Sequence, residues 1–63
     1  MQFKVHTIEG EKFYITAKYY SFEKDGILKF YASEPHVKIE ERKEATKYQF
    51  VTRNVIAVER DAQ

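Results

Sequence analysis

The sequence predicts a mainly β domain, in which an antiparallel meander of about five strands curls into a small open barrel of the SH3-like kind. Three observations predict this fold. Residues 2–32 contain 14 β-branched or aromatic residues among 31, a composition typical of strands. The two glycines are isolated and each follows an acidic residue, as in hairpin turns. Apolar residues alternate along the chain on either side of these turns. A chain of 63 residues forms one domain, residues 1–63.

The first hairpin is predicted from its turn and its alternation together. A two-residue turn would place Lys4 and His6 opposite apolar residues. A three-residue loop over residues 8–10, with Gly10 in the left-handed conformation, keeps one face apolar instead. The cross-strand pairs predicted by this register are Val5 with Phe13 and Phe3 with Ile15.

The second hairpin is predicted at Asp25-Gly26, a strong signal for a two-residue type I′ turn. This turn pairs Lys24 with Ile27, and it then sets Ser21 opposite Phe30. One face of the hairpin is apolar throughout in this register. The residues on that face are Phe13, Ile15, Ala17, Tyr19, Leu28, Phe30 and Ala32.

Residues 34–47 leave two alternatives open. Val37 and Ile39 alternate with polar residues, which suits an edge strand, whereas residues 40–46 are rich in helix formers. Pro35 is compatible with the first turn of a helix and with a strand edge. We favour an extended segment followed by a turn or by one helical turn.

A third hairpin is predicted near the end of the chain. A loop over residues 52–54, with Asn54 in the left-handed conformation, sets Phe50 opposite Ile56 and Tyr48 opposite Val58. Curling of the whole meander would enclose an apolar core. Its expected members are Phe3, Val5, Ile15, Leu28, Phe30, Phe50, Ile56 and Val58.

The opposite face of the second hairpin carries the candidate binding site. The predicted register places Tyr20 opposite Tyr31 and Phe22 opposite Lys29, so that aromatic residues gather on one outer patch with lysines at its rim. The expected partner-binding residues are Tyr14, Lys18, Tyr20, Phe22, Lys29 and Tyr31.

This patch has three interpretations. It can be buried within the domain, under residues 34–47 or under another hairpin, because small domains use every apolar residue they have. It can be a protein interface, since Tyr and Phe are enriched in interfaces. It can also stack the bases of single-stranded nucleic acid, with Lys18 and Lys29 on the phosphates. A net charge of only +1 counts against the third interpretation.

Composition argues against catalysis and against bound cofactors. The chain has no cysteine, which excludes disulfides and thiolate chemistry. His6 and His36 lie far apart in the sequence without acidic neighbours at ligand spacing, so no metal site is expected. No serine lies in a glycine elbow, and no glycine-rich loop could hold a phosphate. A chain of this size also has little volume for a substrate pocket. No apolar run reaches the roughly 20 residues of a membrane span.

Three segments of the chain carry a resemblance to known proteins. They are Thr7–Phe13 (TIEGEKF), Asp25–Tyr31 (DGILKFY) and Asn54–Glu59 (NVIAVE). Together they resemble small, uncharacterised β-rich proteins of bacteriophages and bacterial mobile elements. The resemblance implies an intracellular, cytoplasmic accessory protein that acts by binding.

We therefore expect a non-enzymatic interaction module that docks on a protein partner or on itself through the aromatic patch. A dimer formed edge to edge through residues 36–40 is a related hypothesis. The alternative function is binding of single-stranded RNA or DNA by the same patch. No cofactor, small-molecule substrate or membrane association is expected.

Overall fold

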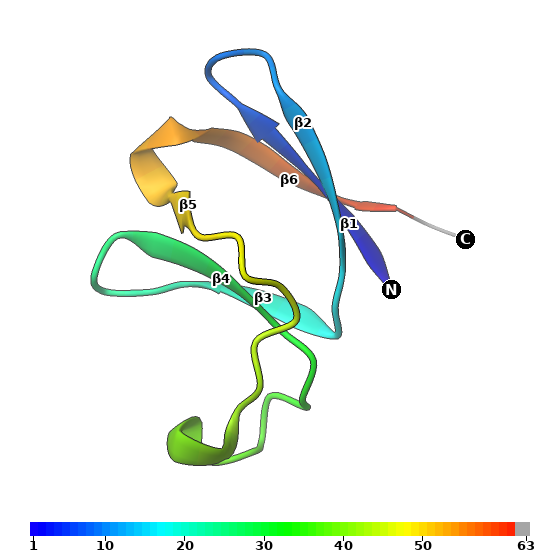
Figure 1. The fold of residues 1–63 in the computed structure, drawn as a ribbon, viewed down its shortest axis with the longest axis vertical. Coiled ribbons are helices and arrows are strands. Elements are labelled where there is room, and N and C mark those ends of the chain that lie inside the picture. Colours follow the sequence, from blue (N-terminus) through cyan, green and yellow to red (C-terminus); the bar gives the residue numbers. More distant parts are fainter. Residues whose placement is uncertain (62–63) are drawn as a thin grey trace.

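A computed structural model describes residues 1–61 and shows a mainly β protein built from two three-stranded antiparallel sheets (Figure 1). The first sheet has the strand order β2-β1-β6 and the second has the order β3-β4-β5. The strands are β1 (Gln2–Thr7), β2 (Lys12–Thr16), β3 (Tyr19–Phe22), β4 (Ile27–Tyr31), β5 (Phe50–Val51) and β6 (Val55–Asp61). Two short 3₁₀ turns, η1 (Ile39–Glu41) and η2 (Thr52–Asn54), complete the described part of the chain.

The first hairpin forms as predicted. Val5 lies opposite Phe13 and Phe3 lies opposite Ile15. Gly10 has a φ of 86°, and its N–H donates to the carbonyl oxygen of Thr7 at 3.0 Å. The three-residue loop and the left-handed glycine that closes it are both confirmed.

The second hairpin forms, but its turn is one residue longer than predicted. Only Gly26 has a positive φ there, at 82°, and the N–H of Glu23 donates to Ile27 at 2.9 Å, closing a three-residue loop. The Asp25 carboxylate accepts the Ile27 N–H at 3.1 Å and holds this loop without a left-handed aspartate. The predicted cross-strand pairs are therefore wrong by one residue. The observed pairs are Tyr19–Tyr31, Tyr20–Phe30, Ser21–Lys29 and Phe22–Leu28.

A bend between β2 and β3 carries the chain from the first sheet to the second. The Ala17 N–H donates to the carbonyl oxygen of Met1, just before β1 of the first sheet, at 3.0 Å, and the Lys18 N–H donates to that of Tyr31 in the second sheet at 2.8 Å. The alternation of inward and outward side chains slips by one residue at this bend. Ala17 is buried in the core. Three residues later, Tyr20 lies opposite Phe30, a core residue of β4, and therefore faces the core. The expectation that Tyr19 faces the core is therefore wrong.

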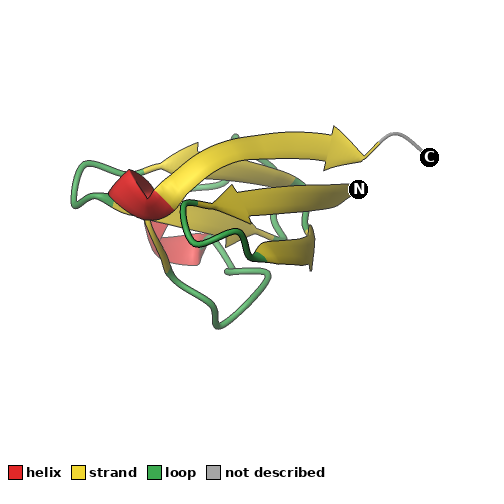
Figure 2. Cartoon of the chain, turned by 90° about the horizontal axis from the view of Figure 1, so that it is seen from above, coloured by secondary structure: helices red, strands yellow, loops and turns green. Residues whose placement is uncertain are grey.

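The predicted third hairpin does not form. β5 pairs with β4, with Phe50 opposite Leu28, and β6 pairs with β1, with Val58 opposite Val5. Residues 52–54 form η2 between the two sheets, and Asn54 has no positive φ. β6 pairs with β1 along six positions. β5 has only two residues and could offer β6 far fewer backbone hydrogen bonds. Figure 2 shows β6 lying along β1, with its end beside the N-terminus.

The segment between β4 and β5 has a helical turn but no strand at residues 36–40. The Val37 N–H closes a turn on Glu34 at 3.2 Å, and η1 follows. Further along, Ala45 donates to Phe30 at 2.8 Å, which places this segment beside the end of β4. The helical turn is confirmed, but the extended edge at residues 36–40 is wrong. The hypothesis of a dimer paired through that edge loses its structural basis.

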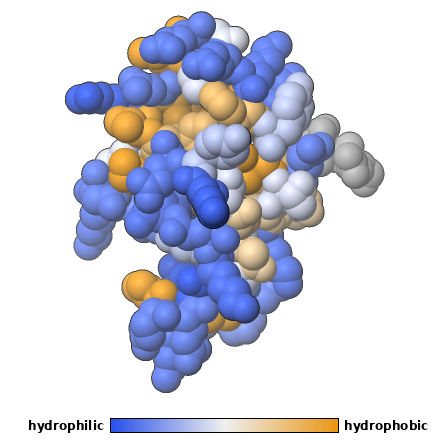
Figure 3. Space-filling model, viewed as in Figure 1, coloured by the Kyte–Doolittle hydropathy of each residue, from blue (hydrophilic) through white to orange (hydrophobic). Residues whose placement is uncertain are grey.

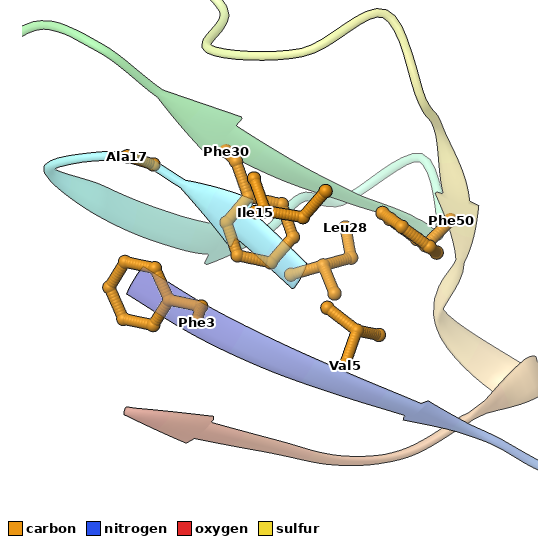
Figure 4. Packing of buried hydrophobic residues seen from close by; sticks show 7 residues of the cluster. All are labelled: Phe3, Val5, Ile15, Ala17, Leu28, Phe30 and Phe50. Carbon is orange, nitrogen blue, oxygen red and sulfur yellow. The ribbon is translucent and has the colours of Figure 1, made fainter. Parts of the chain in front are cut away.

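The core lies between the two sheets, whose side chains point toward one another (Figure 4). Six of the eight expected core residues are buried. Val58 is only partly buried, and Ile56 is 67% exposed, so its assignment to the core is wrong. The buried cluster consists of Phe3, Val5, Ile15, Ala17, Leu28, Phe30 and Phe50.

Candidate interaction surface

The structure separates the residues that were expected to share one aromatic patch. Tyr14 lies on β2, in the other sheet from Tyr20 and Tyr31, and its side chain is 57% exposed. The Lys4 ammonium group lies 5.8 Å from the Tyr14 ring centroid, a cation–π contact across the β1–β2 pair. Tyr14 is thus an isolated exposed aromatic residue.

Tyr31 is buried, in contrast to its predicted position on the outer patch. Its side chain is only 7% exposed, and its ring stacks on Tyr19 with 4.8 Å between centroids. The Arg42 guanidinium group lies 5.7 Å from the Tyr31 ring centroid. Glu23 accepts a hydrogen bond from the Tyr31 hydroxyl group. For this residue, burial under the segment between β4 and β5 is the correct interpretation.

The environment of Tyr31 makes the stability of the domain sensitive to alkaline pH. Burial, and then the hydrogen bond to Glu23, raise the pKa of Tyr31 from 10.0 to about 12. Above pH 10 the unfolded chain loses this proton while the folded chain still holds it. The free energy of unfolding therefore falls between pH 10 and pH 12, by an amount on the order of 2 kcal/mol.

We expect the variant Tyr31→Phe to lack this decrease in the free energy of unfolding between pH 10 and pH 12. Because other tyrosines and the lysines also titrate in this range, the informative quantity is the difference between the variant and the unmodified protein in urea unfolding at pH 8 to 12. Parallel curves for the two proteins would contradict the prediction.

The two lysines expected at the rim of the patch are each close to a carboxylate. Lys18 Nζ lies 2.9 Å from Glu34 Oε1, and this hydrogen bond lowers the pKa of Glu34. Lys29 Nζ lies 3.8 Å from Asp25 Oδ2. Lys18 stays beside Tyr20 at the bend, whereas Lys29 belongs to the face of β4 that also carries Tyr31.

Tyr20 and Phe22 are the expected site residues that the structure keeps together and exposed. They lie on the core-facing side of β3, yet their side chains are 36% and 51% exposed. Their rings meet edge to face at 5.8 Å, and Tyr20 also contacts Phe3 at 5.2 Å between centroids. The aromatic core thus continues outward to solvent along β3. We call Tyr20 and Phe22, with the free backbone edge beside them, the β3 aromatic edge.

The backbone of β3 adds unused hydrogen-bonding groups to this surface. β3 is an edge strand of its sheet and, within the described residues, pairs with β4 alone. Because Glu23 and Ile27 form a hydrogen-bonded pair, the antiparallel ladder alternates so that Tyr20 and Phe22 direct their N–H and C=O groups away from β4. Within residues 1–61, no backbone hydrogen bond is formed on that side of Tyr20 or Phe22. Such an edge can pair with another strand.

A shallow hollow adjoins the β3 aromatic edge and brings in residues that sequence reasoning missed. It lies where the start of β1 and the end of β6 approach the bend. Arg60 enters it because β6 pairs with β1 and sets Arg60 opposite Phe3, a pairing that the predicted third hairpin concealed. The residues that line it are Met1, Phe3, Lys18, Tyr19, Tyr20 and Arg60.

The remaining exposed apolar residues are dispersed. Ile39 is exposed on η1, whereas Ile8 and Ile56 are exposed where the end of β1 meets the start of β6. Figure 3 shows apolar side chains surfacing in several groups on the face it displays. Isolated residues of this kind are normal on protein surfaces. Tyr48 is 61% exposed and also touches the core, through Phe50. The β3 aromatic edge differs because both of its contacting rings are exposed.

The histidines lie apart from this surface. His6 Nε2 lies 2.7 Å from Glu59 Oε1 on the neighbouring strand, at an ion-pair distance but without the alignment of a hydrogen bond. Among the side chains that the structure describes, no group of three or more acidic or histidine residues is arranged to hold a metal ion.

The fold and the surface together define a small two-sheet β domain with an open aromatic edge. No protein-family model matches the chain, and neither the curated proteins nor the solved structures contain a significant match to it. Residues 1–61 include no helix with the length and apolar character needed to cross a membrane. The resemblance to phage proteins and the cytoplasmic location stay predictions.

Proposed function

We propose that this protein is a non-enzymatic interaction module that binds an extended protein segment along the β3 aromatic edge. One observation carries the proposal: two contiguous aromatic side chains are exposed beside a strand edge whose backbone groups have no partner in the described chain. Binding by strand addition uses both features, because backbone hydrogen bonds give affinity and side-chain contacts give specificity.

The aromatic rings are suited to act as anchors. Tyr20 is held by Phe3 and Phe30, at 5.2 and 5.8 Å between centroids, and it in turn supports Phe22. A ring already fixed by its neighbours loses little conformational freedom on binding. Aromatic residues at the centre of a desolvated contact commonly contribute most of the binding energy.

We further propose that the two sheets are the halves of an SH3-like barrel. In this proposal β2 and β3 act as one bent strand shared by both sheets, which is supported by the hydrogen bonds of Ala17 and Lys18 at the bend. The strands then follow one another in the order β6-β1-β2/β3-β4-β5. η2 joins β5 to β6 at the far side, where Ile8 donates to Asn54 at 2.9 Å. In this arrangement the exposed rings lie at one mouth of the barrel.

To test the binding function, peptides would be selected for binding from a displayed random library. One selected peptide would then be titrated into the labelled protein. We expect the backbone amide signals of Tyr20 and Phe22 to shift. Phe22→Ala should weaken the affinity for the peptide at least about 30-fold, which corresponds to the loss of a hot spot of about 2 kcal/mol. Tyr14→Ala is the matched control, since Tyr14 is exposed to a similar extent but lies on the other sheet. Selected peptides that shift Tyr14 and spare β3 would contradict the proposal.

Binding of single-stranded nucleic acid is the second candidate. It is favoured by the hollow, where Lys18 and Arg60 flank Tyr20 and where no acidic side chain is among the lining residues that the structure describes. A base stacked on Tyr20 would leave its phosphates near these cations. A short mixed-sequence oligonucleotide at low salt tests this candidate. Arg60→Ala should weaken such binding and reduce its salt slope by about 1.

A further inference from the structure

We infer that the strand which occupies the β3 aromatic edge is β3 of a second copy of this chain, paired antiparallel about a two-fold axis. This inference rests on the proposed function, since both use the same edge. The observations that carry it are the register of the free backbone groups, the side chains that this register brings together, and the lack of charged residues within β3.

The free backbone groups define how two copies would meet. Tyr20 and Phe22 direct their N–H and C=O groups outward, and Ser21 directs its groups toward β4. In an antiparallel pair, outward residues must lie opposite outward residues. The register that uses both residues of each copy sets Tyr20 opposite Phe22 of the second copy and places Ser21 on the two-fold axis. Each Tyr20 then exchanges N–H···O bonds with the opposing Phe22 in both directions.

The side chains that meet in this register are compatible. On the core-facing side, Tyr20 of each copy lies against Phe22 of the other, so four rings form one cluster continuous with both cores. On the opposite side, two Ser21 hydroxyl groups face each other across the axis and can hydrogen-bond. The two copies would share a six-stranded sheet.

The other exposed edges are less suited to pairing. β2 begins with Lys12, the outer part of β6 carries Glu59 and Arg60, and β5 has only two residues. Charged side chains and short length are the usual protections of an edge strand. β3 consists of Tyr19, Tyr20, Ser21 and Phe22 and carries no charge and no proline. Among the exposed edge strands longer than two residues that the structure describes, β3 is the one without a charged residue or a proline along its whole length.

One feature of this register opposes association and can be measured. It brings Lys18 near Lys24 of the second copy, although Glu34 lies 2.9 Å from Lys18 within each chain. Added salt screens such repulsion. The dimer should therefore strengthen as the salt concentration rises, whereas binding to a nucleic acid would weaken.

Ser21 on the axis permits a charge-swap experiment. In the variants Ser21→Lys and Ser21→Glu, each chain would place its new charge directly opposite the identical charge of its copy. Sedimentation equilibrium should show a concentration-dependent dimer for the unmodified chain, and self-association weakened at least about tenfold for either variant alone. An equimolar mixture of the two variants should restore a dimer, because the introduced ammonium group of one chain then faces the introduced carboxylate of the other across the axis. Circular dichroism checks that both variants fold.

A cysteine cross-link tests the register independently. The chain has no cysteine, so Ser21→Cys would supply the sole thiol, at a position where opposing Cα atoms lie close enough for a disulfide. Mild oxidation should give a cross-linked dimer. Thr16→Cys, on an exposed position of β2, should stay monomeric under the same conditions.

The outcomes separate this inference from the proposed function. A chain that is monomeric at millimolar concentration, or whose dimer is unaffected by both Ser21 variants, overturns the second copy as the occupant. If selected peptides still bind at Tyr20 and Phe22 in that case, the proposed function stands without the dimer. If no peptide binds there and no dimer forms, both fall together.

Discussion

The variant Phe30→Ala is expected to lose most of the stability of the domain. Phe30 is 1% exposed and its ring contacts Phe3, Tyr20 and Phe50, from strands of both sheets. Truncation of a buried phenylalanine costs about 3–5 kcal/mol, because it removes apolar contacts and leaves a cavity. A domain of this size has roughly 3–9 kcal/mol in total. The variant should therefore be largely unfolded or melt far below the unmodified protein.

Thermal and urea unfolding followed by circular dichroism would measure this loss. Ile39→Ala is the matched control, since Ile39 is 77% exposed and its truncation should change the free energy of unfolding by less than about 0.5 kcal/mol. A Phe30→Ala variant within about 1 kcal/mol of the unmodified protein would show that the two sheets do not share one cooperative core.

The second large effect is expected for Arg42→Ala, which should release the segment between β4 and β5. Arg42 donates from Nε to Val37 at 3.0 Å and from its terminal nitrogen to Pro35 at 3.2 Å. Its guanidinium group also lies 5.9 and 5.7 Å from the ring centroids of Tyr19 and Tyr31. Two hydrogen bonds and two cation–π contacts together amount to roughly 3 kcal/mol.

Amide hydrogen exchange would locate the effect of Arg42→Ala. Exchange should accelerate at residues 33–45, while β1 and β6 change much less, because opening of this segment is local. Lys43→Ala is the control, because it is the Lys43 backbone, whose carbonyl oxygen accepts the N–H of Ala32 just after β4, that holds this segment in place. Arg42→Lys should fail to rescue the protection, because an ammonium group cannot make the forked contacts of the guanidinium plane. Uniform acceleration throughout the chain would contradict the prediction.

Local patterns in the sequence predicted the parts of the fold that depend on local chemistry. The loop at residues 8–10 was predictable because Gly10 and the apolar alternation demanded the same register. The turn at Asp25-Gly26 was located correctly, but its length was not. Either of two loop lengths keeps Leu28 and Phe30 inward, and the carboxylate of Asp25 decided between them by accepting the Ile27 N–H.

The candidate site was predicted less well because its arrangement depends on long-range pairing. At the bend the alternation of side chains shifts by one residue, so that Tyr20 rather than Tyr19 faces the core. This shift depends on the hydrogen bond from the Lys18 N–H to the carbonyl oxygen of Tyr31 in β4. The position of Arg60 depends on the pairing of β6 with β1, and no short-range pattern in the sequence predicts that pairing. Tyr20 and Phe22 were nevertheless identified as a pair of neighbours, since their spacing along one strand puts them on one face under either register.

The pairing of β6 with β1 also has a consequence for how the chain reaches this structure. Val5 finds its partner at Val58, so the first sheet is completed only after residues from both ends of the described chain have met. Contacts of such sequence separation carry a large loop-closure entropy and make folding slow for the size of the domain. On a ribosome, β1 would leave the exit tunnel well before its partner strand is made. During that interval its other neighbour, β2, gives it only a marginally stable hairpin.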